Sequence, residues 1–272
     1  MRESTYNAKF IRYDNKVEII RYREPKLKVF GNGYKKSYPL RHDKTEPDEE
    51  LQKLQQMYRI KRKIKYYLSV NYFDLFWTLT FNDELVNAKN YDYARKKIQA
   101  WLKYQREKYG KFSFVFVPEL HKSKRIHFHG VTGYLSPPLV EARSKKTNRL
   151  IKKKGKQVYN AENYKLGFST ITYIESPERV SSYLTKYITK ELIDTPSGYH
   201  QPKYFVSRGL KLPEISYKQI DDDYFGAFEA SFVTGTLGDK NKFEADISIY
   251  HIVIDENGEM KQHDIQQIVK IK

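Results

Sequence analysis

The chain has 272 residues and no cysteine, and its 50 Lys and Arg residues against 33 Asp and Glu residues give a formal net charge of +17. Such an excess indicates a polyanionic partner, with nucleic acid as the first candidate and an anionic membrane surface as the second. Disulfides and thiolate metal sites are excluded, no apolar run is long enough for a membrane helix, and the first residues lack the apolar stretch of a signal peptide.

We therefore expect a cytosolic protein that works on nucleic acid without a membrane. The 24 tyrosines, interleaved with Lys and Arg, would suit stacking on bases, although an AT-rich genome enriches tyrosine and lysine as well. The length allows one large domain, or a catalytic domain with smaller flanking pieces.

Alternating apolar and polar residues predict strands, and apolar residues at helical spacing predict amphipathic helices. In chain order the predicted elements are a small β unit over 1–40, a helix from Asp48 to about Ser69, a strand over Leu75–Phe81, a helix over Tyr91–Tyr109, a hairpin of Lys111–Leu120 and Ile126–Leu135, a strand over Gly167–Ile174, a helix from Pro177 to about Ile193, a strand over Tyr204–Ser207 and tail segments over 247–254 and 265–271. Turns are expected at Asp14-Asn15 and at Gly31-Asn32-Gly33, followed by a polar break over 41–47. The basic segment 141–165 predicts no clear element.

The motif His127-Phe128-His129 is the sharpest local signal. Residues two apart on a strand point to the same face, so both imidazoles would converge while Phe128 enters the core. The hairpin turn would place Glu119 nearly opposite them, with His121 as a neighbour or a substitute ligand. Imidazole with carboxylate suits Mn²⁺, Zn²⁺ or Ni²⁺, and Mg²⁺ when water and phosphate complete its shell. The alternative is a coincidental pair, but three of the seven histidines lie between positions 121 and 129.

A second pattern puts Tyr183, Lys186, Tyr187 and Lys190 on one stripe of a predicted helix. A phenol with a pKa of about 10 is a poor nucleophile, and an adjacent ammonium group favours the phenolate. Lysine also neutralises charge that grows on a phosphate under attack. The alternative is an ordinary amphipathic helix with half-buried tyrosines. The His-x-His strand and the charge of the chain favour chemistry.

Taken together, these residues resemble the HUH endonuclease superfamily, and within it the phage and plasmid rolling-circle replication initiators of the two-tyrosine type. The stretches that carry the resemblance are Phe76–Phe81, Pro118–His121 with Arg125–Gly130, Gly167–Thr170, the tandem Tyr-x-x-Lys motif of Tyr183–Lys190, and Ser207–Leu210. The resemblance covers roughly residues 50–213.

The resemblance implies an α+β fold, in which a central antiparallel sheet with flanking helices forms an RRM-like palm and carries the two histidines on a middle strand. The implied domains are a β extension over 1–47, the endonuclease domain over 48–213 and a β-rich extension over 214–272. The implied metal ligands are Glu119, His127 and His129, for Mn²⁺ or Mg²⁺.

The resemblance also implies a reaction. A tyrosine attacks single-stranded or stem-loop origin DNA, leaving a 5′-phosphotyrosine and a 3′-OH for the host polymerase, and the strands are later rejoined. The Lys190-Glu191 pair favours Tyr187 as the first nucleophile. Because the sequence holds no Gly-x-x-x-x-Gly-Lys-Ser/Thr loop, unwinding would fall to a host helicase. The expected setting is the cytoplasm of a bacterium that carries the phage or plasmid.

Basic residues near these motifs are expected to bind DNA, namely Lys122, Lys124, Arg125, Lys152, Lys153 and Lys154. Rival interpretations are an HUH transposase or relaxase, a non-catalytic DNA- or RNA-binding module, and a metal-dependent nuclease that uses activated water. The tandem tyrosines argue against a single-tyrosine transposase, and relaxases usually carry three histidine ligands.

Overall fold

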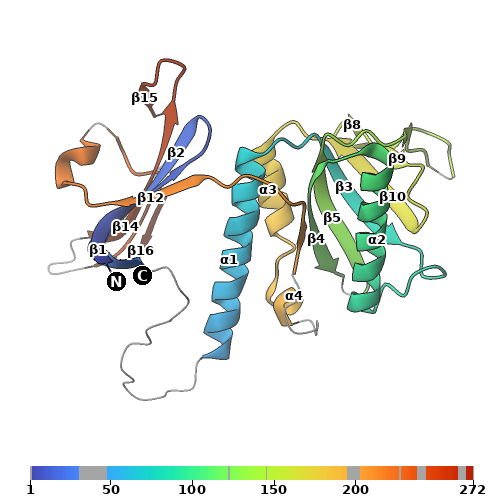
Figure 1. Ribbon diagram of the computed structural model, residues 1–272, viewed down its shortest axis with the longest axis horizontal. Coiled ribbons are helices and arrows are strands. Elements are labelled where there is room, and N and C mark those ends of the chain that lie inside the picture. Colours follow the sequence, from blue (N-terminus) through green and yellow to red (C-terminus); the bar gives the residue numbers. More distant parts are fainter. Residues whose placement is uncertain are drawn as a thin grey trace. The chain divides into compact units, whose positions relative to one another are not determined.

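The computed structural model describes residues 2–30, 48–121, 123–144, 146–194, 203–226, 228–237, 243–262 and 268–271. The chain divides into two compact units, which are residues 45–212 and residues 1–44 together with 213–272 (Figure 1). The expected turn at Gly31–Gly33, the polar break over 41–47 and Lys122 lie outside the described residues.

The unit 45–212 is built on a seven-stranded antiparallel sheet with flanking helices, so the predicted α+β fold is confirmed. Its strand order is β11-β4-β5-β3-β10-β9-β6. The elements are α1 (Glu49–Val70), β3 (Leu75–Phe81), α2 (Tyr91–Tyr109), β4 (Ser113–Leu120), β5 (Ile126–Gly133), β6 (Leu139–Glu141), β7 (Lys152–Lys153), β8 (Lys156–Gln157), β9 (Tyr159–Ala161), β10 (Gly167–Tyr173), α3 (Pro177–Thr185), α4 (Lys190–Asp194) and β11 (Phe205–Val206). Strands β7 and β8 form a separate two-stranded hairpin.

Helix α2 covers one face of this sheet (Figure 1). Trp101 of α2 meets Trp77 of β3 and Phe116 of β4 edge to face, with ring centroids 5.6 Å and 6.5 Å apart. Gly130 of β5 lies beneath Phe116, and a Cβ atom there would come within 2.2 Å of the phenyl ring. The glycine therefore lets the aromatic layer close over the centre of the sheet.

Helices α1, α3 and α4 form a second layer, and α1 packs against both of the others. Asp48 caps α1 by accepting a hydrogen bond from the Leu51 backbone N–H, and Lys53 of α1 pairs with Asp194 of α4 at 3.0 Å. Among helices in the described ranges, none combines the length and the apolar character that crossing a bilayer requires.

The second unit joins the two ends of the chain in one sheet. Its strand order is β12-β1-β2-β14-β13-β16, with β15 paired to β14. The elements are β1 (Arg2–Arg12), β2 (Lys16–Phe30), β12 (Glu214–Lys218), the 3₁₀ helix η1 (Asp222–Phe225), β13 (Phe232–Leu237), β14 (Phe243–Ile254), β15 (Met260–Lys261) and β16 (Ile268–Ile271). Phe225 stacks on Tyr250 with ring centroids 3.9 Å apart, which closes a small core over one face.

Candidate active site

The pairing of β4 with β5 brings the acidic residue and the two histidines onto one face of the sheet. Glu119 lies directly opposite His127, and its Oε2 is 2.7 Å from Nε2 of His129. Phe128, between the histidines, points to the opposite face and is fully buried. His121 is exposed, and its ring centroid lies 5.7 Å from that of His127. The four side chains therefore gather where the sequence predicted them.

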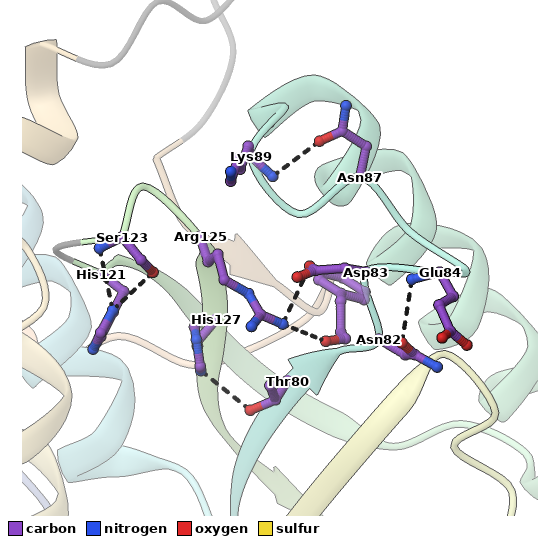
Figure 2. Close-up of polar contacts among 11 residues, drawn as sticks. Thr80, Asn82, Asp83, Glu84, Asn87, Lys89, His121, Ser123, Arg125 and His127 are labelled. Atoms are coloured by element: carbon purple, nitrogen blue, oxygen red, sulfur yellow. Dashed lines mark hydrogen bonds and ion pairs between the residues drawn. The ribbon is translucent and has the colours of Figure 1, made fainter.

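Two threonines of the neighbouring strand β3 hold the histidine rings. The hydroxyl of Thr80 is 3.1 Å from Nδ1 of His127, and that of Thr78 is 3.1 Å from Nδ1 of His129. Figure 2 shows the Thr80 contact at the edge of the sheet. Because a hydroxyl both donates and accepts, it can support either ring tautomer. In the tautomer with the proton on Nδ1, the Nε2 lone pair of each histidine is available to a ligand.

Burial keeps both imidazoles neutral. The pKa values of His127 and His129 are lowered from 6.5, mainly because the protein removes water from the rings, while the carboxylate of Glu119 opposes this shift. His129 is the more enclosed of the two, at 4% exposed. Neutral imidazole is the form that binds a metal ion.

The donor set fits a divalent cation after one rearrangement. Among the described residues, no three His, Asp or Glu side chains form a finished metal cluster, because Glu119 and His129 contact each other directly. The carboxylate of Glu119 also lies in register with His127, so rotation about its side-chain bonds serves either histidine. One carboxylate with two imidazoles leaves positions open for water or a phosphate oxygen.

The loop beside the site is fastened by Arg125. Its guanidinium donates to the backbone carbonyl of Phe81 at 3.0 Å and lies 3.2 Å from Asp83 (Figure 2). The hydroxyl of Ser123 is 3.0 Å from Nδ1 of His121 in the same turn. Arg125 therefore ties the end of β3 to the start of β5. Lys124 is exposed at the tip of this turn, with a backbone φ of 61°.

The predicted single helix over 177–193 is two helices, and this part of the prediction was wrong. Helix α3 begins at a Ser176 cap and ends at Thr185, whereas α4 begins at Lys190. The Thr185 hydroxyl donates back to the Ser181 and Ser182 carbonyls, and tighter 3₁₀-type bonds follow it. Tyr183 consequently lies on α3, and Tyr187 lies in the turn beyond it.

Both tyrosines meet the histidine face from this turn. The Tyr187 ring stacks on the His129 ring, with centroids 3.9 Å apart and planes 5° from parallel. The Tyr183 ring lies edge-on to both, 5.2 Å from Tyr187 and 6.1 Å from His129. Burial, followed by a hydrogen bond with Tyr183, raises the pKa of the Tyr187 phenol. The stripe predicted from sequence thus brings two phenols to the histidine pair.

Lysines flank Tyr183 from two directions. The ammonium of Lys186 lies 5.8 Å from the centroid of its ring, and that of Lys153 lies 5.9 Å away. Lys153 belongs to the β7–β8 hairpin, whose two turn residues, Lys154 and Gly155, both have positive φ, as a type I′ turn requires. An ion pair between Lys156 and Glu175 anchors this hairpin. The exposed Lys152 lies next to Lys153 on β7, and the side chain of Lys190 lies outside the described residues.

The positive charge of the chain is concentrated in the unit that carries this site. Residues 45–212 hold 32 Lys and Arg against 16 Asp and Glu, whereas the other unit holds 18 against 17. A cationic surface around an active site concentrates a polyanion such as DNA there.

Residues 74–192 match the profile of a family of replication-associated proteins of the ORF2 type. The match spans β3 to α4 and contains Glu119, His127, His129, Tyr183 and Tyr187. No curated protein and no solved structure matches the chain.

Proposed function

Because residues 74–192 belong to this family of replication-associated proteins, we propose that the chain is a replication initiator that nicks and rejoins single-stranded origin DNA. The observation that carries the proposal is the stacking of Tyr187 on His129, which joins a nucleophile candidate to a metal-ligand candidate at 3.9 Å. An HUH-type enzyme of the two-tyrosine class needs both groups at one phosphate.

Glu119, His127 and His129 would hold Mn²⁺ or Mg²⁺, and a bound ion would supply Lewis-acid polarisation of a non-bridging phosphate oxygen. Thr78 and Thr80 fix the rings that point at this position. Phe76 packs behind His129, with centroids 6.3 Å apart, and so restricts the ring from the other side.

A tyrosine oxygen would attack the phosphorus while the bond to the 3′ oxygen breaks, which gives a 5′-phosphotyrosine and a free 3′-OH. Rejoining reverses these bonds, and no ATP is consumed because the phosphotyrosine retains the ester. We propose Tyr183 as the first nucleophile, since the ammonium groups of Lys153 and Lys186 flank its ring. Two cations favour the phenolate and compensate charge on the phosphate.

The function is tested by incubating the protein and Mn²⁺ with a pool of single-stranded oligonucleotides of randomised sequence. We expect cleavage of a subset, with protein bound to the new 5′ ends after denaturation in detergent. Cleavage without attached protein would indicate activated water instead of tyrosine. Binding without cleavage would indicate a non-catalytic nucleic-acid-binding module.

Replacing Thr80 or Thr78 with valine is expected to weaken Mn²⁺ binding about 10- to 100-fold, because the histidine rings lose the hydroxyl that orients them. Isothermal titration with Mn²⁺ measures this effect directly. Thr170→Val is the matched control, since Thr170 lies beside Thr78 on β10. Equal affinity in all three variants would show that the threonines do not support a metal site.

Replacing Lys153 with alanine is expected to slow the first cleavage about tenfold, the scale of one hydrogen bond to a charged group. Lys152→Ala is the control, because neighbouring residues on a strand point to opposite faces. Single-turnover cleavage of a selected oligonucleotide gives the rate. The same loss in both variants would mean that the hairpin acts only through its general charge.

A further inference from the structure

The face of the sheet that carries the histidines continues past them onto β10, where it is open. Register pairs Glu119 with His127, His127 with Thr80 and Thr80 with Phe168, so these four residues form one row across β4, β5, β3 and β10. Directly paired residues of an antiparallel sheet share a face. Phe168 therefore lies on the same face as the candidate metal ligands, about two strand spacings, or ~10 Å, from His127.

Phe168 is unusual on this row because it is a large apolar side chain that stands in solvent. It is 57% exposed, while Ser169 and Ile171, on the opposite face of β10, are buried. Thr170, beside it on the same face, is exposed as well. The layer that buries His129 therefore leaves the β10 end of this row uncovered.

The backbone holds Phe168 firmly in this position. Gly167 precedes it with a φ of +156°, and a Cβ atom there would come within 2.2 Å of the Thr80 carbonyl oxygen. The close approach that only glycine allows sets β10 against β3 at the point where Phe168 faces Thr80. On its other side, β10 pairs with β9 at Ile171, away from Phe168. The phenyl ring thus stands on a fixed strand at an open edge.

We propose that Phe168 is a stacking platform for a base of the single-stranded DNA next to the phosphate that is cut. This inference rests on the proposed function for the nature of the ligand. A lone exposed aromatic residue is ordinary on a protein surface. Here the ring shares a row with a carboxylate and an imidazole, within a unit that carries a large cationic excess. Aromatic rings on a sheet, in a cationic setting, bind unpaired bases through their π faces.

The chain supplies a matched control on the same strand. Tyr173 is also aromatic and is also 57% exposed, but it lies on the face of β10 opposite to Phe168. Any loss that comes from removing an exposed aromatic residue from β10 would affect both positions equally. Only a role on the histidine face separates them.

The test measures fluorescence-anisotropy binding of a labelled oligothymidylate at one fixed salt concentration, in a Tyr183→Phe/Tyr187→Phe background that cannot form an adduct. We expect Phe168→Ala to weaken binding at least about fivefold, with Tyr173→Ala unchanged. Phe168→Trp should retain affinity and show tryptophan quenching on binding, whereas Tyr173→Trp should show none. Trp77 and Trp101, which are buried, give the same background in both.

Equal binding by Phe168→Ala and Tyr173→Ala, or an unquenched tryptophan at position 168, would overturn the proposal. So would an equal loss of affinity of Phe168→Ala for a duplex of the same length, because stacking needs an unpaired base. Adduct formation by the chain with both tyrosines is scored separately. Failure of the proposed function therefore appears as absent adduct, and failure of this inference appears as unchanged binding.

Discussion

A chain in which both Tyr183 and Tyr187 are replaced by phenylalanine is expected to form no covalent adduct with single-stranded DNA. The change removes two hydroxyl groups and keeps the rings, including the one that stacks on His129 at 3.9 Å. Folding and DNA binding should therefore persist while the nucleophile is lost. Denaturing gel electrophoresis with 5′- and 3′-labelled oligonucleotides measures the adduct.

The single variants separate the two tyrosines. If Tyr183 acts first, Tyr183→Phe should abolish the first cleavage, and Tyr187→Phe should impair the later cut and rejoining. Tyr173→Phe, an exposed tyrosine of β10, is the control and should behave as the unaltered chain. An adduct that survives in the double variant would refute the assignment of either tyrosine.

Alanine at His127 or His129 is expected to reduce cleavage by at least about a hundredfold, because Lewis-acid stabilisation of a phosphate contributes several kcal/mol and depends on both ligands. Mn²⁺ binding measured by titration should fall in parallel, while binding of single-stranded DNA stays nearly constant. A suitable control is His251→Ala, since His251 also lies across a strand pair from a carboxylate, 3.4 Å from Glu18, but in the other unit. Cleavage that persists in the His129 variant would contradict the metal site.

The pH dependence of Mn²⁺ affinity follows from the same burial. Both histidine pKa values are lowered from 6.5, so the rings remain neutral at and somewhat below that pH. Protons therefore compete with the metal only at lower pH than they would for exposed histidines. We expect the affinity, measured by titration across a pH series, to hold down to pH 6.5 and to fall below it.

Local patterns in the sequence were enough to predict most of the sheet and the heart of the site. Strand β3, helix α2 and the β4–β5 hairpin lie where alternation, helical spacing and Gly110 placed them, because burial on one face is what those patterns record. The His-x-His spacing likewise follows from the two-residue period of a strand. These features depend on neighbours in the sequence or on one tight turn.

Features that depend on distant residues were not predicted. The threonine contacts require the pairing of β3 with β5, although the alternation of Thr78 and Thr80 was a usable signal. The β7–β8 hairpin reaches Tyr183 through contacts that its lysine-rich sequence does not encode locally. In the second unit, Asn7 bonds both backbone groups of Ile220, a pairing across most of the chain.

The end of α3 illustrates a different failure. Helical spacing continues through Tyr187 to Leu192, so the pattern predicted one helix. The competing hydrogen bonds of Thr185 and Thr189 decided otherwise, with the Thr189 hydroxyl accepting from the Leu192 backbone N–H as a cap for α4. The result moves Tyr187 into a turn, where its ring can lie flat on His129.

Mass spectrometry of the covalent complex tests the central claim most directly. After reaction with Mn²⁺ and a selected oligonucleotide, nuclease and protease digestion should leave a peptide that carries a 5′-linked nucleotide on Tyr183 or Tyr187. A nucleotide attached to any other residue, or cleaved DNA with no modified peptide, would contradict the account.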